Sequence, residues 1–526
     1  MSTELLVLMV LAAVLVLIVL SDRIDVPYPI LLVLGGCGLG FLPGVPNVRL
    51  APDVVLLVVL PPLLYSAAFF TSLRELRTNL RPISFLAVGL VLATMGVVAV
   101  IAHELIPGMG WGPAFVLGAV VSPTDPVAAI AIAQRLNVPR RVVTVVEGES
   151  LINDATALVA YRVAVVAVVS GSFSLLDAGG RFVLNVTAGA AIGLVVGWLV
   201  AQLRRRIDNP PVEMAISVAT AYFAYIPAQE IGVSGVVAAV TVGVYLGWRT
   251  PQLISPSTRM QLFGVWEVLT FFLNCFLFVI IGLQLPSILD ALGGRSPGQL
   301  ILYAAVVSAA VIVTRLVWMP VMAWLPRRLF RRIRERDPFP PWEEIVLGGW
   351  TGMRGAVSLA AALALPLATG AGDPFPQRDL IVFLTFCVIL VTLVLQGLSL
   401  PALIRRLDVH DDYETRSESK ARLKAARAAI ARVEQLRDEE WTRDDTMDRL
   451  RAMYEYRTRR FTARFREPED GEDYEARADQ YQRALREVLQ AQRQAIVQMR
   501  DEGTISSETM HRIERDLDLE DSRLEI

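Results

Sequence analysis

The chain has 526 residues, of which 54 % are hydrophobic, and its formal net charge is −2. Soluble domains are about 45–50 % apolar, and here the apolar excess lies before residue 407. This composition excludes an ordinary soluble protein and predicts an all-α polytopic membrane protein with a polar tail. The charge averages two unlike halves, and neither half indicates nucleic-acid binding.

The cysteines and histidines indicate no catalytic or metal chemistry. Cys37, Cys275 and Cys387 all lie in apolar segments, which is typical of small buried hydrophobes rather than of disulfides or a zinc site. The three histidines are scattered, and we find no phosphate loop or nucleophile constellation. We therefore expect neither an enzyme nor a resident cofactor.

Apolar stretches long enough to cross a bilayer, which need about 20 residues each, recur along the chain. We count thirteen of them: 4–22, 28–44, 53–70, 82–106, 112–134, 141–170, 181–204, 211–229, 232–248, 259–285, 298–325, 342–367 and 379–405. The first begins with an acidic flank, so we interpret it as a retained helix and not as a signal peptide. The predicted domains are a transmembrane domain over 1–407 and a cytosolic helical tail over 408–526.

Arginine placement predicts the orientation. Eighteen arginines lie in the loops that follow spans 1, 3, 5, 7, 9 and 11, whereas the opposite loops contain four. By the positive-inside rule the first set faces the cytoplasm. We therefore expect a multi-pass protein of the plasma (inner) membrane, with its N-terminus outside and its C-terminal tail in the cytoplasm.

Two of the spans are interrupted. In the fifth, Ser122-Pro123-Thr124-Asp125-Pro126 places two prolines around an aspartate, and each proline removes a helical N–H, which leaves carbonyls unpaired. In the twelfth, Gly348 to Gly355 contains four glycines, a pattern that fits unwinding and small-xxx-small helix packing equally well. Breaks in spans 5 and 12 fit two inverted six-helix repeats that are joined by a linker helix. Paired breaks of this kind indicate a transport site near the middle of the membrane.

The sixth span carries the most costly side chains. A charge near the bilayer centre costs about 2.5–3.5 kcal/mol, yet this span holds Glu147, Glu149 and Asp154 beside Ser150 and Asn153. Helical spacing puts Glu147, Ser150 and Asp154 on one face, and Glu149 and Asn153 on the next. The acids must therefore be paired or hold a cation.

We predict different roles for these acids. Glu149 and Arg354 form a candidate buried ion pair between spans 6 and 12 with a structural role, since breaking such a pair leaves a costly lone charge. Asp154 and Asp125 are candidate functional acids, because ionisable residues inside a membrane are usually functional. Glu147 fits either a third site carboxylate or a position near a water-filled vestibule.

The oxygen-rich set predicts a monovalent-cation site. Na+, K+ and Li+ prefer oxygen ligands, and Asp154, Asp125, Ser150, Thr124 and the freed carbonyls supply them. A partly dehydrated carboxylate also binds a proton more readily than one in water, so proton and metal ion compete for it. Such competition is the basis of cation/proton exchange.

Three motifs resemble the signature segments of monovalent cation/proton antiporters, the sodium/proton exchanger group. They are Pro123-Thr124-Asp125-Pro126, Glu149-Ser150-Leu151-Ile152-Asn153-Asp154 and Gly352-Met353-Arg354-Gly355, with support from Leu60-Pro61-Pro62-Leu63-Leu64. The resemblance covers roughly residues 1–405. It implies an NhaA-type antiporter fold of inverted repeats with discontinuous crossing helices, a homodimer with dimerisation and core domains, and elevator-like movement of the core.

The resemblance also assigns residues. It makes Asp154 the carrier of cation and proton, Asn153 its partner, Asp125, Thr124 and Ser150 their neighbours in the cation site, and Glu149 with Arg354 the structural pair. Some relatives have an acid just after the span 3 motif, where this chain has Tyr65-Ser66. Ser66 is therefore only an accessory candidate.

Two departures from the pattern of electrogenic relatives predict the ratio of cations to protons exchanged. Electrogenic relatives have two aspartates where this chain has Asn153-Asp154, and a lysine in span 11 at the place that Arg315 can occupy. The absence of both favours electroneutral exchange. From position alone, Arg315 either snorkels or pairs with an acid, and it is an accessory candidate.

These inferences predict a secondary active transporter that exchanges Na+ (or K+) for H+ across the plasma membrane by alternating access, with 1:1 stoichiometry and a role in pH homeostasis. Two alternatives stay open. A sodium-coupled carrier of an organic anion would need a basic or polar pocket beside the ion site. A membrane sensor would signal through the charged tail, where Leu423 to Leu436 and Leu485 to Gly503 predict amphipathic helices.

Overall fold

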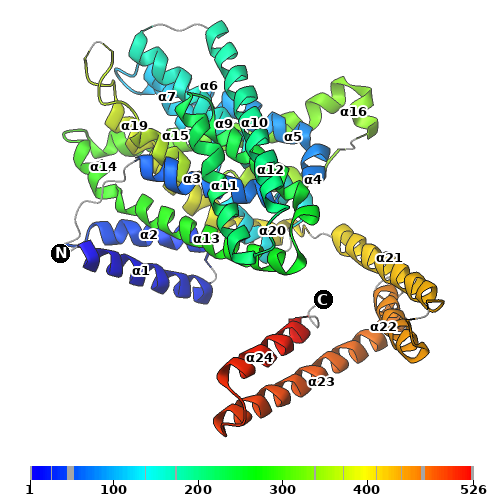
Figure 1. Ribbon diagram of the computed structural model, residues 1–526. Coiled ribbons are helices and arrows are strands. Elements are labelled where there is room, and N and C mark those ends of the chain that lie inside the picture. Colours follow the sequence, from blue (N-terminus) through cyan, green and yellow to red (C-terminus); the bar gives the residue numbers. More distant parts are fainter. Residues whose placement is uncertain are drawn as a thin grey trace. The chain divides into compact units, whose positions relative to one another are not determined.

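The computed structural model describes residues 3–24, 26–43, 52–136, 138–171, 175–336, 339–370, 372–409, 412–439, 441–463 and 468–522. They divide into two compact units, Met1–His410 and Asp411–Ile526, and both units are helical (Figure 1). The predicted all-helical architecture is therefore confirmed. The division of the chain into a membrane domain and a cytosolic tail stays a prediction.

The first unit contains long helices, short π-helical turns labelled η, and two helices that are broken in the middle. In chain order the elements are α1 (Thr3–Ile24), α2 (Tyr28–Gly40), η1 (Val54–Val59), α3 (Leu60–Phe70), α4 (Leu73–Thr78), α5 (Leu80–Ser84), η2 (Phe85–Leu90), α6 (Val91–Leu105), α7 (Trp111–Val121), α8 (Val127–Arg135), α9 (Arg140–Ser170), α10 (Leu175–Arg204), α11 (Pro210–Glu230), α12 (Gly235–Leu253), α13 (Pro256–Leu283), α14 (Leu285–Ala291), α15 (Pro297–Leu329), α16 (Arg331–Arg336), α17 (Trp342–Trp350), α18 (Ala356–Leu363), α19 (Arg378–Val391), η3 (Thr392–Gln396) and α20 (Gly397–Leu407).

Each of the thirteen predicted spans coincides with helical segments. Six helices among the described residues are long and apolar enough to cross a membrane: Leu80–Leu105, Arg140–Ser170, Gly179–Arg204, Pro256–Ala291, Pro297–Leu329 and Arg378–Leu407. Three shorter helices are also apolar. The unit is thus that of a multi-pass membrane protein, while the number of thirteen crossings and the inverted repeat stay predictions.

Both predicted helix breaks are present. The fifth span divides into α7 and α8, and the twelfth divides into α17 and α18. The two breaks touch, because the backbone N–H of Asp125 donates a 2.8 Å hydrogen bond to the carbonyl of Met353. Gly355 makes this contact possible, since a Cβ there would fall within 1.8 Å of an Asp125 carboxylate oxygen.

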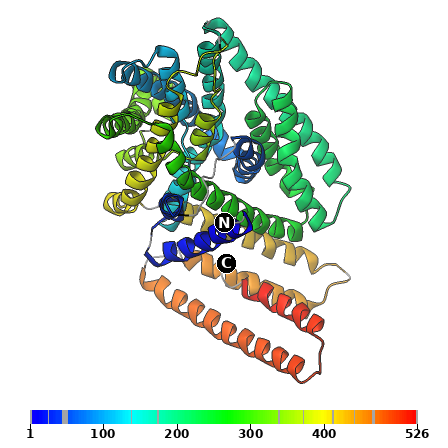
Figure 2. The same cartoon turned by 90° about the vertical axis from the view of Figure 1, so that its left-hand side faces the viewer.

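Glycines also set the closest helix contacts elsewhere in the unit. Helices α1, α2 and α13 lie side by side (Figure 2), and a Cβ at Gly282 of α13 would fall 2.3 Å from the Val33 carbonyl of α2. On α10, a Cβ at Gly193 would fall 2.5 Å from the Ala238 carbonyl of α12. Small residues that let backbones approach are the usual basis of helix packing in membranes.

The second unit contains α21 (Asp412–Leu436), α22 (Asp444–Ala463), α23 (Pro468–Asp501) and α24 (Ser507–Ser522). Arg451 of α22 forms a 2.9 Å ion pair with Glu434 of α21, whereas α23 and α24 share an apolar cluster around Leu489 and Met510. The two helices predicted from apolar spacing are confirmed, including an end near Gly503, whose φ is +74°. Helix α22 was not predicted, because its apolar residues are sparse among charges.

We expect Gly282→Ala to destabilise the first unit by about 1–3 kcal/mol, because overpacking a tight contact forces the backbones of α2 and α13 apart. Gly264→Ala on the same helix is the matched control, since nothing lies within 4 Å of a Cβ at that position. The measurement is the thermal unfolding midpoint of the purified protein in detergent. Equal midpoints for the two variants would contradict the close packing of α2 on α13.

Candidate cation site

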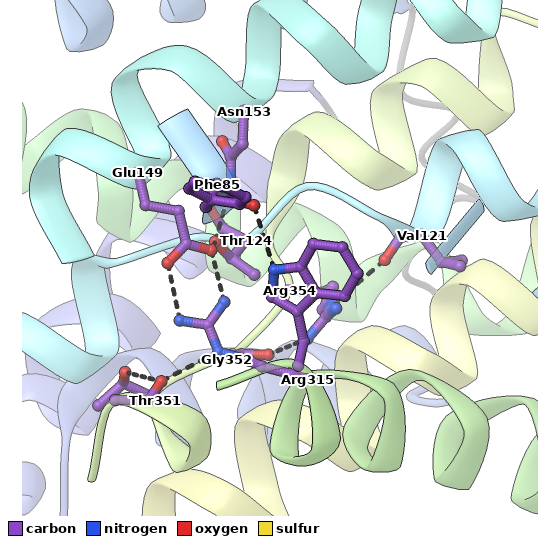
Figure 3. Close-up of polar contacts among 11 residues, drawn as sticks. Phe85, Val121, Thr124, Glu149, Asn153, Arg315, Thr351, Gly352 and Arg354 are labelled. Atoms are coloured by element: carbon purple, nitrogen blue, oxygen red, sulfur yellow. Dashed lines mark hydrogen bonds and ion pairs between the residues drawn. The ribbon is translucent and has the colours of Figure 1, made fainter. Parts of the chain in front are cut away.

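The candidate site lies where three segments meet. These segments are the break between α7 and α8, the middle of α9, and the break between α17 and α18. Figure 3 shows the side chains of Thr124, Glu149 and Asn153 close together, with Arg315 and Arg354 beside them. The structure therefore brings together predicted site residues that are distant in the sequence.

A buried ion pair links α9 to α15. Both carboxylate oxygens of Glu149 accept hydrogen bonds from Arg315, one of them from Nη2 at 2.8 Å and the other from Nη1. The Arg315 Nε donates to the carbonyl of Gly348 at 3.1 Å. Both side chains are 1 % exposed. Because the pair is bidentate and dry, removal of either partner would leave a lone buried charge.

The predicted pair between Glu149 and Arg354 is wrong. Arg354 instead directs its guanidinium at the broken helices, where Nε donates to the Val121 carbonyl at 3.1 Å and Nη1 donates to the Gly352 carbonyl. Those carbonyls lack a helical N–H partner because the helices stop there. Gly352 also leaves room for Arg315, since a Cβ at Gly352 would fall 2.3 Å from the Arg315 Cδ.

One signal in the sequence could have identified the true partner. Arg315 is the sole charged residue in the first thirty residues of α15, which is otherwise apolar up to Arg327. An arginine in the middle of such a helix needs a buried acid. Position alone did not distinguish snorkelling from pairing, and the structure now shows pairing.

A chain of hydrogen bonds extends from the ion pair to Asn153, the residue before Asp154 on α9. The Thr124 hydroxyl donates to Glu149 at 3.0 Å, and it accepts a 2.8 Å hydrogen bond from the Asn153 Nδ2. The orientation of the Asn153 amide is therefore fixed through Thr124. Its Oδ1 is buried and has no hydrogen-bond partner within the described residues, so it remains an available oxygen ligand.

The two aspartates differ in their surroundings. Asp125 Oδ1 accepts a 2.9 Å hydrogen bond from the backbone N–H of Val127, at the start of α8. Asp154 is 7 % exposed, and none of the side chains or backbone groups that the structure describes donates a hydrogen bond to it. The two carboxylates lie close enough to interact electrostatically. Asp154 is thus the acid of this site that lacks a compensating donor.

Other predicted residues lie around or away from this centre. Ser150 is half-buried one turn before Asp154, and Ser66 donates to the carbonyl of Leu63 at 3.0 Å on α3. Roles for both as cation ligands stay predictions. Glu147 lies near Arg140 and Glu75, at the beginning of α9, so the structure does not bring it to the Thr124–Asn153 chain.

A cavity lies along α8, the helix that begins after Asp125. Its empty volume is about 1180 Å³, and its walls come from α1, α2, α8, α13 and α20. Asp22, Gln134 and Tyr28 line it, and Tyr28 lies close enough to Asp125 for an electrostatic interaction. Sequence reasoning did not identify Tyr28, because its apolar segment carries no motif.

Comparison with known proteins identifies the family. Residues 10–406 match the transmembrane domain of sodium/hydrogen exchangers. The chain belongs to the sodium/hydrogen exchanger family. The family predicted from the three motifs is therefore confirmed, and a sodium/hydrogen exchanger is a membrane transporter and not an enzyme.

Several relatives resemble this exchanger along most of its length. An uncharacterised Na+/H+ exchanger of Mycobacterium tuberculosis is 39 % identical over 98 % of this chain and 94 % of that protein. The sodium, potassium, lithium and rubidium/H+ antiporter of Bacillus subtilis is 30 % identical over 92 % of this chain and 72 % of its own. The low-affinity Na+/H+ antiporter NhaS1 of Synechocystis is 35 % identical over 78 % and 74 %.

A solved structure shares the fold of the exchanger. The sodium proton antiporter MjNhaP1 of Methanocaldococcus jannaschii superimposes with a TM-score of 0.60 and 18 % identity, over 77 % of this chain and 99 % of that one. At this identity the likeness concerns the fold and not the ligands of the site.

We expect Arg315→Gln to lower stability by about 3–5 kcal/mol, because it leaves the Glu149 carboxylate buried without its partner. Arg162→Gln, an exposed arginine on α9, is the control and should have little effect. The measurement is the thermal unfolding midpoint in detergent.

The double variant Glu149→Gln with Arg315→Gln discriminates between the two possible partners. We expect it to lose less stability than the sum of the single variants, since no lone charge remains. The opposite result would be strictly additive stability losses for Glu149→Gln with Arg315→Gln and non-additive losses for Glu149→Gln with Arg354→Gln. That result would make Arg354, and not Arg315, the partner of Glu149.

Proposed function

We propose that the protein exchanges Na+ or K+ for H+ across the plasma membrane, and that Asp154 is the carboxylate that carries both ions in turn. The observation that carries the proposal is the buried Asp154 carboxylate, which no described group donates to. The preceding residue on α9, Asn153, has a buried amide oxygen that also has no partner in the described part of the chain. A bare alkali cation or a proton satisfies such a site.

The Glu149 charge on the same helix as Asp154 is already balanced. Arg315 neutralises Glu149, and Asn153 adds an oxygen without adding charge. Asp125 is held by the N–H of Val127 and contributes negative potential to the site. One proton therefore leaves the Asp154 carboxyl when one cation binds, and a 1:1, electroneutral exchange follows. The ratio of protons released to cations bound measures this stoichiometry.

The helix breaks indicate how ions reach the site. Discontinuous helices that cross at one point are typical of transporters whose binding site opens to either side in turn. The cavity that Tyr28 and Asp22 line supports an approach from the face that the arginine distribution assigns to the cytoplasm. We propose alternating access by movement of the helices that carry the site, in a homodimer, with the N-terminus outside and the tail inside.

Relatives support both cations. The Bacillus subtilis relative is named for sodium, potassium, lithium and rubidium, and the Synechocystis relative for sodium. Carboxylate and amide oxygens bind any of these hard cations. We therefore include Na+, K+ and Li+ as transported ions.

The organic-anion alternative has less support at this site. A carboxylate substrate would need a cationic group beside the cation. Arg315 is engaged by Glu149 and Gly348, and Arg354 donates to Val121 and Gly352 through Nε and Nη1, so that only its buried Nη2 is without a partner among the described residues. The sensor alternative predicts that removal of residues 408–526 abolishes function, whereas an exchanger keeps residual flux without its tail.

We expect Asp154→Asn to reduce Na+/H+ and K+/H+ exchange to the rate of protein-free vesicles, because an amide neither releases a proton nor carries the charge that binds a cation. Fluorescence dequenching of a pH dye in proteoliposomes measures this rate. Asp290→Asn, on the exposed surface of α14, is the control and should exchange at the wild-type rate. Exchange retained by Asp154→Asn, with an unfolding midpoint equal to wild type, would remove Asp154 as the carrier.

A further inference from the structure

A second cavity lies on the opposite side of the Glu149–Arg315 pair from Asp154 along α9. It is partly open to the surroundings, with about 700 Å³ of unfilled space when its open mouth is included, and its walls come from α5 with η2, the first turns of α9, the second half of α15, and α17. It extends along α15 from Arg327 to Arg315, a distance of about 18 Å at 1.5 Å per residue. Arg315, the basic member of the ion pair, thus forms part of its inner end.

Basic side chains surround the outer end of this cavity. Arg81, Arg141 and Arg327 line it together with a single acid, Glu344, which leaves a positive balance. Arg141 is exposed, Arg81 is half-buried, and Arg327 is 5 % exposed. All four side chains already make polar interactions, so the attraction for an anion comes from the net charge and not from a vacant donor.

The walls between the two ends are apolar. Phe85, Val145, Met319 and Met322 line the cavity between the basic outer end and Arg315. Phe85 is 41 % exposed although it belongs to a helix of the apolar unit. A small inorganic anion would gain nothing from such walls, whereas an amphiphile would bury hydrocarbon against them.

We propose that this cavity binds the phosphate headgroup of an anionic phospholipid, with the upper part of an acyl chain against the apolar wall. Basic cavities between spanning helices on the cytoplasmic side suit such headgroups. The arginines concerned lie at the ends of α5, α9 and α15, on the side that the positive-inside rule assigns to the cytoplasm. The proposal goes beyond cation/proton exchange, because no transported ion needs to enter this cavity.

The site would connect lipid composition with the exchanger core. Arg315 contributes to the inner end of the cavity and holds Glu149, and Glu149 accepts the Thr124 hydrogen bond that fixes Asn153. A lipid that braces α15 against α9 and α17 therefore stabilises the same helices that carry the cation site.

The test measures binding without transport. The full-length protein in neutral detergent is titrated with a short-chain phosphatidylglycerol, a matched phosphatidylcholine, and inorganic phosphate, and the thermal unfolding midpoint gives the affinity. We expect phosphatidylglycerol to raise the midpoint, while phosphatidylcholine and phosphate leave it unchanged. In Arg81→Gln with Arg141→Gln the affinity should fall about thirtyfold, since each arginine contributes about 1 kcal/mol to binding of an anionic lipid.

Two further variants separate the cavity from general surface charge. Arg205→Gln with Arg206→Gln removes the same charge from exposed positions after α10, outside the cavity, and should bind like wild type. Val145→Phe fills the apolar wall without changing charge and should bind weakly. Each of three results would overturn the proposal. They are an equal loss of lipid affinity in the two double arginine variants, wild-type lipid affinity in Val145→Phe, and a midpoint shift with inorganic phosphate alone that equals the shift with phosphatidylglycerol.

Discussion

The Glu149–Arg315 ion pair is the constraint on which the site depends. Two charges that are almost fully buried stabilise a fold only when each satisfies the other, and here the bidentate contact does so. The pair fixes α9 against α15 and provides the acceptor that orients Thr124, which in turn orients Asn153. Because Glu149 is neutralised in this way, Asp154 can serve as the exchangeable acid of the same helix.

The broken helices bring these groups together at the level of the backbone. Prolines stop α7, glycines stop α17, and the two breaks meet through the hydrogen bond from Asp125 to Met353. The Arg354 guanidinium donates hydrogen bonds to the carbonyls of Val121 and Gly352. Of the carbonyls that the prolines free, that of Ala119 accepts a 2.8 Å hydrogen bond from the Ser122 hydroxyl and is therefore less available to a cation, so the side chains of α9 gain importance as ligands.

Features that depend on local chemistry could be predicted from the sequence. Hydropathy located the helical segments, the prolines around Asp125 and the glycines around Arg354 located the breaks, and the motifs identified the family. The isolated charge of Arg315 in an apolar helix indicates that it needs a buried acid, but the choice between Arg315 and Arg354 as the partner of Glu149 depends on which helix packs beside α9, which the sequence does not show. The cavity that ends at Arg315 could not be predicted either, since its walls come from four segments that are separated in the sequence.

The most direct test of the central claim measures protons and cations together. Purified protein in unbuffered detergent solution at mildly acidic pH is titrated with NaCl, and both the Na+ bound and the H+ released are counted. We expect the wild-type protein to release one proton per cation bound, and Asp154→Asn neither to bind the cation nor to release a proton. Cation binding without proton release, or unchanged release by Asp154→Asn, would contradict the claim that Asp154 holds the two ions in turn.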